Sequence, residues 1–217
     1  MAFDTGQTQD YRILKDLLAP LDQADIPWTG AMGNHDRRKN FAEVFPEHAA
    51  RSLFDGRMVF RVETPFVDFL LLDSLIQHED PKQVIVPGEI RDDQKEWLHE
   101  TLKASTKPVI VGAHHPLEET KLSDLLKSHP CVAGYINGHR HYWISNQQSF
   151  TPALILPSNG FWGDIGVVNA RFSSKAAEFT LTMRDYIPPG KVATDEAPEK
   201  QAKIAEKQGA KWTLELG

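Results

Sequence analysis

The chain has 217 residues, of which 41% are hydrophobic and 25% are charged, and its formal net charge at pH 7 is -6. These values are ordinary for a soluble globular protein, and the length allows one domain with a sizeable core and at most a tail. The single cysteine excludes an intramolecular disulfide and a cysteine-rich zinc site.

The same composition bears on partners and compartment. No apolar run approaches the length of a membrane span, which argues against a membrane protein. The first residues lack the basic and apolar regions of a signal peptide, so the sequence as given predicts a cytoplasmic protein. The acidic balance and the absence of a long basic run argue against a nucleic-acid partner. Nothing in the sequence indicates the oligomeric state.

Helices and strands alternate through the first two thirds of the chain. Apolar residues at helical spacing predict a helix over 8–21, which Pro20 should stop or kink, and a short strand follows over 26–32. Two more helices are predicted to begin near residues 90 and 122. The remaining strands of this part are predicted over 58–62, 67–75, 109–112 and 132–136.

The pattern then changes to strands joined by short loops, at 149–156, 165–172 and 177–183. We therefore predict an α/β domain over residues 1–186, with parallel strands first and antiparallel strands later. From Ile187 the composition shifts to a charged segment, so residues 187–217 are predicted to be a tail or surface helix. In that segment the alternating residues Trp212, Leu214 and Leu216 could form a short edge strand.

The first polar cluster is Gly33-Asn34-His35-Asp36, after the strand predicted at 26–32. Gly33 allows a sharp turn and a close backbone approach. The amide oxygen of Asn34 is a neutral metal ligand, and His35 could donate a proton or hydrogen bond to an ester oxygen. The alternative interpretation is a plain turn or helix cap, because Asn and Asp are common there.

Two histidine clusters follow further strands. Ala113-His114-His115-Pro116 comes directly after the strand at 109–112, where a histidine is a suitable nitrogen ligand for zinc, iron or manganese. Adjacent histidines point in different directions, so at most one of this pair should bind a given ion. In Gly138-His139-Arg140-His141, residues at i and i+2 of an extended chain share a side, so both histidines could face one site.

The order of these clusters resembles the C-terminal part of the calcineurin-like metallophosphoesterase signature, over roughly residues 4 to 185. That pattern runs Asp-x-His, Gly-Asp-x-x-Asp, Gly-Asn-His-Asp/Glu, a lone His and Gly-His-x-His. A looser similarity to bacterial cyclic-nucleotide phosphodiesterases extends over residues 88–98 and 107–109. The resemblance implies a four-layer α/β/β/α sandwich of two mixed sheets and hydrolysis of a phosphomonoester or phosphodiester by hydroxide activated at two metal ions (manganese, iron or zinc).

The resemblance also implies roles for individual residues. Three match ligands of the second metal, Asn34, His114 and His139, and one, His141, matches a ligand of the first metal. His35 matches the histidine that contacts the phosphate and protonates the leaving oxygen, and Asp4 matches the aspartate that holds it. Arg37 and His115 lie beside the motifs and are predicted to bind substrate, with surface charge as the alternative for Arg37.

The upstream motifs of the signature are not in the sequence as given. The bridging aspartate falls at or before Met1 and the Asp-x-His motif lies further upstream, so the first β-α unit is expected to be missing and only the second metal site to be largely present. A start assigned too late is the favoured explanation, and a degenerate, non-catalytic chain is the alternative. Two other functions stay open: a binding or scaffold module on the same fold, and a nuclease.

Overall fold

The computed structural model describes residues 6–80, 82–146, 151–159, 163–185 and 197–216. Its N-terminal part begins with α1 (Thr8–Gln23), which is followed by α2 (Arg38–Val44) and α3 (Pro46–Ala49). α1 continues through Pro20 to Gln23, so the predicted stop is wrong. Because Pro20 is exposed, water can satisfy the carbonyl that the proline leaves without an amide partner. The three helices share an aromatic core that includes Tyr11, Phe41 and Phe45.

The larger sheet has six strands in the order β1-β2-β3-β4-β6-β5. Its central strands β2, β3, β4 and β6 are parallel, whereas β1 and β5 pair antiparallel at the two edges. The strands are β1 (Phe60–Glu63), β2 (Asp68–Leu71), β3 (Val109–Ala113), β4 (Val132–Asn137), β5 (Ile144–Asn146) and β6 (Ala153–Ile155). All five residues of β3 are buried, as expected for a strand covered on both faces.

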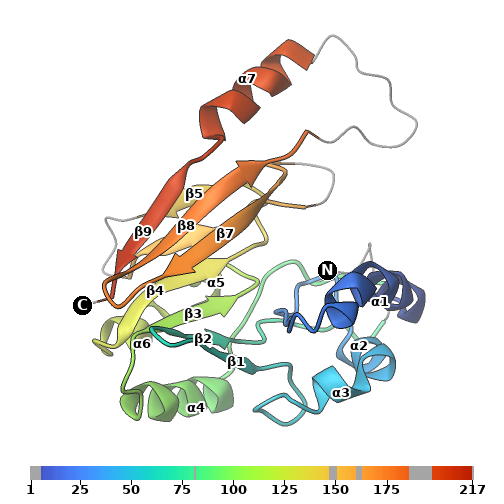
Figure 1. The fold of residues 1–217 in the computed structure, drawn as a ribbon. Helices are drawn as coiled ribbons and strands as arrows, with labels where there is room; N and C mark the ends of the chain where they lie inside the picture. The colour runs from blue at the N-terminus through green and yellow to red at the C-terminus, as the bar shows by residue number, and fades with distance from the viewer. Residues whose placement is uncertain (1–5, 81, 147–150, 160–162, 186–196, 217) are drawn as a thin grey trace.

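Helices cover one face of this sheet and a second sheet covers the other (Figure 1). The helical layer comes from α4 (Asp92–Lys103) and α6 (Ser123–Lys127), with the one-turn α5 (Leu117–Thr120) beside them. Leu98, Leu102, Leu122 and Leu126 of this layer pack on the sheet. These positions follow the helical spacing that predicted the two helices.

The second sheet has three antiparallel strands, β7 (Gly166–Phe172), β8 (Ala176–Met183) and β9 (Lys211–Glu215), in that order. The prediction of two sheets is confirmed, but this one is antiparallel rather than mixed. Its inner face, with Phe179, Leu181 and Trp212, packs on the larger sheet. Alternate residues of β9 are exposed on its outer face, so the described residues form a helix/sheet/sheet arrangement without the predicted fourth layer over this strand.

The C-terminal segment contains α7 (Ala197–Lys207) and the strand β9. Trp212 and Leu214 are buried against β4, where a Cβ on Gly134 would lie 2.8 Å from Leu214. The edge strand expected from these alternating residues is therefore present. The domain boundary at residue 186 stays a prediction, although β9 is part of the common core.

Residues 26–32, predicted as a strand, are irregular in the structure. No described strand lies alongside to form a hydrogen-bonded ladder with them, and an apolar run without a ladder partner is not a β-strand. The C-terminal end of this segment still lies in the core, because Met32 is buried. The turn that begins at Gly33 therefore lies next to the ends of the parallel strands.

Candidate metal centre

The centre forms where the carboxyl ends of β3 and β4 meet the turn at Gly33–Asp36. His114 follows β3 and His139 lies two residues after β4, and the two strands pair in parallel up to Ala113 and Asn137. His114 Nε2 lies 2.9 Å from Asn34 Oδ1 and 3.3 Å from His139 Nδ1. The structure thus brings together the three residues that the sequence predicted as ligands of one ion.

These separations fit a common cation. Zinc binds nitrogen and oxygen at about 2.0–2.2 Å, which places neighbouring ligand atoms roughly 2.9–3.5 Å apart in octahedral or tetrahedral geometry. Without a cation, His114 Nε2 carries at most one proton. Asn34 Oδ1 only accepts, so this proton cannot make a well-directed hydrogen bond to Asn34 and also to His139 Nδ1. A cation bound by the lone pairs of all three atoms would remove this conflict.

The turn that carries Asn34 is held from both sides. Asp36 Oδ2 accepts a hydrogen bond from the Gly33 N–H at 2.8 Å, and Asp36 Oδ1 accepts one from the Tyr11 hydroxyl at 2.8 Å. The Tyr11 oxygen in turn accepts the Arg37 N–H at 2.8 Å. Tyr11 was predicted only as part of an apolar stripe, and its hydroxyl adds the anchor that fixes this turn.

Position 33 requires glycine because the His114 ring packs against it, not because of its backbone torsion angles. A Cβ at this position would lie 2.9 Å from His114 Cε1 and 3.0 Å from Nδ1. The imidazole of His114 therefore packs directly on the Gly33 backbone. Any side chain here would push this ring away from Asn34.

His139 and His141 lie on a strained backbone. Their φ angles are +67° and +62°, in the left-handed region that L-residues rarely adopt. The backbone is therefore not extended at these residues, contrary to the assumption behind the prediction, and whether both side chains face one site stays a prediction. Left-handed non-glycine residues concentrate at functional sites, where surrounding contacts maintain the strain.

His115 is fully buried, and both of its ring nitrogens have partners in the protein. Its Nδ1 lies 2.7 Å from Ser74 Oγ and its Nε2 lies 3.1 Å from the Val86 carbonyl oxygen. A carbonyl can only accept, so the proton is on Nε2, and Nδ1 accepts the Ser74 hydroxyl. The ligand atoms of His114, His115 and His139 lie within 4.8 Å of one another, but both nitrogens of His115 already have partners.

His115 packs between the other imidazoles and Gly88, and its predicted substrate contact stays a prediction. Its ring lies 4.9 Å from that of His114 and 4.7 Å from that of His139, measured between centroids. On the opposite side it presses on Gly88, where a Cβ would lie 2.1 Å from His115 Cγ. His115 therefore supports the other two imidazoles while its own polar atoms bond to Ser74 and Val86.

Glu119 of α5 completes the surroundings of His139. Its Oε1 lies 3.9 Å from His139 Nε2 and 3.7 Å from an amino group of Arg140. Its Oε2 accepts the Gly88 N–H at 3.1 Å. When Nδ1 of a histidine binds a metal, Nε2 carries the proton, and a carboxylate near that nitrogen orients the ring.

The imidazoles of the centre are neutral at pH 7. Burial, followed by the charge of His115, lowers the pKa of His114 to about 2. Burial also lowers the pKa of His115 to about 4, with His139 the next cause. Burial lowers the pKa of His139 and His141 as well. A neutral imidazole keeps a free lone pair on one nitrogen, so these histidines are in the protonation state that binds a metal cation.

Arg37 is buried beside the turn, and its predicted substrate-binding role stays a prediction. Only 6% of the residue is exposed, and its guanidinium donates to the carbonyl oxygens of His78, Asp80 and Gln83 at 2.7, 3.2 and 2.5 Å. These bonds tie residues 78, 80 and 83 to Arg37, the residue that follows the turn at Gly33–Asp36. Nothing in the sequence indicated these carbonyl partners, because they lie far from Arg37 along the chain.

The two residues predicted to be catalytic differ in what the structure describes. His35 is exposed, and its charge acts on both His139 and His141, so the three lie within electrostatic range. Asp4 lies outside the described residues. The roles of both stay predictions.

The comparisons agree with this arrangement. The model of the calcineurin-like phosphoesterase family matches residues 2–143, a range that contains every residue of the centre discussed above. The chain belongs to the calcineurin-like phosphoesterase family. Within the described residues, no helix combines the length and the apolar character needed to cross a membrane.

Two curated relatives of this family member are each described as a probable cyclic nucleotide phosphodiesterase. The one from Synechococcus sp. is 24% identical over 175 residues, which cover 74% of this chain and 63% of the relative. The one from Psychrobacter arcticus is 33% identical over 101 residues, which cover 44% of this chain and 34% of the relative. The chain thus spans less than two thirds of the length of either relative.

A solved structure from Staphylococcus aureus, described as a "Putative 5'-Nucleotidase", was also found. It aligns with a TM-score of 0.43 and 11% identity, over 94% of this chain and 48% of that chain.

Sequence reasoning missed Ser74 and Glu119. Ser74 follows β2 at the same sheet edge as His114, and a polar residue beyond a parallel strand is a signal that could have found it. Glu119 had no comparable signal, because an acidic residue in the first turn of a helix is common for electrostatic reasons alone.

Proposed function

We propose that this phosphoesterase hydrolyses a phosphomonoester or phosphodiester with the help of a divalent cation held by Asn34, His114 and His139. The observation that supports this most is the convergence of the three ligand atoms, at 2.9 and 3.3 Å, beside an exposed His35. The family assignment supports the reaction class. The identity of the metal, among manganese, iron and zinc, belongs to the proposal.

The donor set is chemically suited to phosphate chemistry. All three ligands are neutral, so they would not reduce the charge of a bound cation. When bound, the metal would polarise a phosphate oxygen and lower the pKa of a coordinated water toward about 7. A second ion would require His141 together with ligands beyond the described cluster, and three neutral ligands alone should hold one ion weakly.

The protein residues around the cation would divide the remaining tasks. His35 would donate a hydrogen bond or a proton to the leaving oxygen of the ester, a contribution that is typically 10²- to 10⁴-fold in rate. Glu119 and His115 would keep the imidazoles of His139 and His114 in place. Arg37 would hold residues 78, 80 and 83 in place through its hydrogen bonds to their carbonyl oxygens.

The proposal is tested by assaying the chain for hydrolysis of p-nitrophenyl phosphate and its bis ester after loading with manganese. His35→Ala should lower the rate at least about tenfold while metal binding, measured by calorimetry, stays unchanged. His99→Ala is the matched control, because His99 is an exposed histidine on α4. An equal rate in His35→Ala and wild type would remove His35 from the reaction.

One observation favours a second function, that of a metal-binding or scaffold module without turnover. Within the described part of the chain, the potential ligand group consists of histidines and contains no carboxylate. A bridging carboxylate is the ligand that would hold two cations together. A chain that binds one ion with the expected residues yet hydrolyses neither ester would support this alternative.

A further inference from the structure

A basic hollow of about 410 Å³ lies outside the metal centre, between the start of α2, the end of α3 and the loop at 52–58. Arg38, Lys39 and Arg57 line it, against a single acidic residue, Asp55. The chain as a whole carries a net charge of -6. A local excess of cations on an acidic protein identifies a surface that attracts anions.

Arg38 is held in place by a buried carboxylate. Its Nε and Nη2 donate to the two oxygens of Asp73 at 2.6 and 2.8 Å, and Nη2 also donates to the Leu75 carbonyl at 2.6 Å. Asp73 is fully buried. These bonds leave Nη1, with two N–H donors, without a partner among the described residues. Its position is fixed before any ligand arrives.

The loop at 52–58 is equally ordered. Ser52 Oγ donates to the Arg57 carbonyl at 2.6 Å and accepts the Val59 N–H at 3.0 Å. The N–H of Met58 donates to Asp73 Oδ2 at 2.9 Å, so the carboxylate that holds Arg38 also holds this loop. The backbone that carries Arg57 is thereby held by the same carboxylate that binds Arg38.

The guanidinium of Arg57 has no partner of its own. It is half-buried, and in the described ranges no carboxylate or carbonyl lies within ion-pair or hydrogen-bond distance of it. Burial lowers the pKa of Arg57 and the charge of Arg38 lowers it further, whereas the charges of Asp73 and Asp93 act in the opposite direction without reversing the shift. A half-buried cation beside a like charge is unfavourable, and an anion in the hollow would relieve it.

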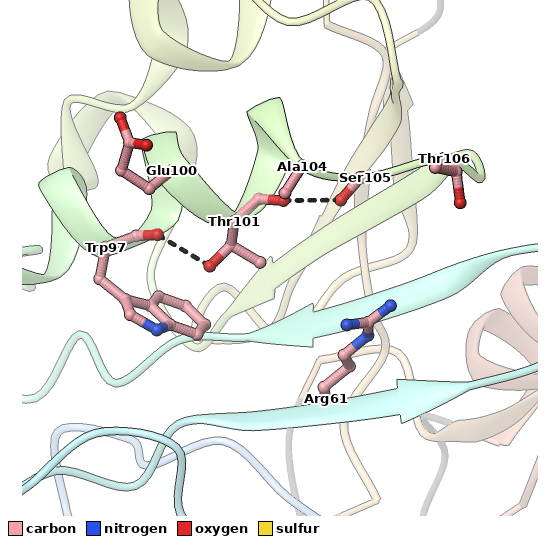
Figure 2. Close-up of a pocket in the computed structure, with 7 residues that line it drawn as sticks. All are labelled: Arg61, Trp97, Glu100, Thr101, Ala104, Ser105 and Thr106. Atoms are coloured by element: carbon pink, nitrogen blue, oxygen red, sulfur yellow. Dashed lines mark hydrogen bonds between the residues drawn. The ribbon is translucent and has the colours of Figure 1, made fainter.

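A second hollow contains an arginine whose guanidinium is paired with carboxylates. It has a volume of about 400 Å³ and lies between β1 and the end of α4 (Figure 2). There Arg61 contacts Glu63 and Asp68 at 3.1 and 2.5 Å. The hydroxyls of Thr101 and Ser105 donate to helix carbonyls. Its arginine and the hydroxyls of Thr101 and Ser105 already have protein partners, so it offers less to a ligand than the hollow at Arg57.

We propose that the hollow at Arg38, Lys39 and Arg57 binds the phosphate group of a small molecule, at a site separate from the metal centre. Three cationic side chains from two segments suit a tetrahedral anion with three free oxygens better than a carboxylate with two. Guanidinium groups provide paired donors for such oxygens. The adjoining Asp73 and Ser74 connect this site to His115, so an occupied hollow would lie close to the centre without sharing its ligands.

The test is titration of the full chain with inorganic phosphate at constant ionic strength, followed through the arginine Nε–H signals by NMR. The Arg57 signal should shift and saturate, and Arg57→Met should weaken phosphate binding about tenfold or more. Lys39→Met, at an exposed position that cannot affect folding strongly, should weaken it about threefold, as expected for an exposed charge. Arg12→Met, an exposed position on α1, is the control that should bind as wild type does.

Three results would overturn the proposal. The first is a wild-type chain without a saturable shift at Arg57. The second is binding that is lost in His114→Ala, because phosphate would then occupy the metal centre. The third is acetate binding as strongly as phosphate, which would assign the hollow to carboxylates. Retained phosphate binding in His114→Ala, with weaker binding in both Lys39→Met and Arg57→Met, would support it, whether or not the chain hydrolyses esters.

Discussion

Replacing Gly33 by alanine tests whether the close contact with His114 positions the metal centre. The new Cβ would lie 2.9 Å from His114 Cε1, whereas ordinary van der Waals contact begins at 3.4 Å. An ordinary contact would require the ring and the new Cβ to separate by a further 0.5 Å, the difference between these two values. Metal–ligand distances tolerate only about ±0.2 Å. The displacement exceeds what the ligand set can absorb.

We expect Gly33→Ala to weaken zinc or manganese binding by about tenfold to hundredfold, as displaced ligand supports do. The free energy of unfolding should fall by only about 1 kcal/mol, at the low end for overpacking, because His114 is half-buried and its ring can move. Isothermal titration calorimetry measures the first quantity and urea denaturation the second.

Gly138→Ala is the matched control, because a Cβ there would lie 3.6 Å from His114 Nδ1, an ordinary contact with the same ring. It should bind metal within about twofold of wild type, since nothing must move. Equal losses in the two variants would refute the steric reasoning. Wild-type affinity in Gly33→Ala would show that His114 is not a ligand.

Three further substitutions test the supports of the fold and the site. Tyr11→Phe removes a hydroxyl that bonds Asp36 and a backbone amide, and should cost about 2–3 kcal/mol in urea denaturation; a loss below about 0.5 kcal/mol would contradict that role. Ser74→Ala leaves His115 Nδ1 without its donor and should cost about 1–2 kcal/mol in the same assay, so unchanged stability would count against the bond. Burial lowers the pKa of His48 to about 4, so wild type should lose up to about 3 kcal/mol relative to His48→Phe as the pH falls from about 6.5 to 4; parallel stability curves would exclude this titration.

Much of the fold could be predicted because buried strands and helices have recognisable apolar patterns in the sequence. The apolar runs that became β3 and β4 are bounded by turn residues and end in polar clusters. Parallel strands end at one sheet edge, which places polar clusters there, and the family resemblance implied that His114 and His139 share a metal. The alternation of Trp212 and Leu214 likewise indicated an edge strand.

The remaining features depend on tertiary contacts that no local pattern records. The apolar run at 26–32 met the local criteria for a strand but has no ladder partner among the described residues. The left-handed angles of His139 and His141 are imposed by their surroundings, against the preference of the residue type. The guanidinium of Arg37 donates hydrogen bonds to carbonyl oxygens more than forty residues away in the sequence, and a hydropathy pattern cannot indicate such partners.

The most direct measurement of the central claim is the side-chain ¹⁵N spectrum of the histidines during titration with zinc. We predict coordination shifts at Nε2 of His114 and Nδ1 of His139, with both nitrogens of His115 unchanged because Ser74 and Val86 already bind them. Shifts confined to His115, or none at His114 and His139, would contradict the assignment of this centre.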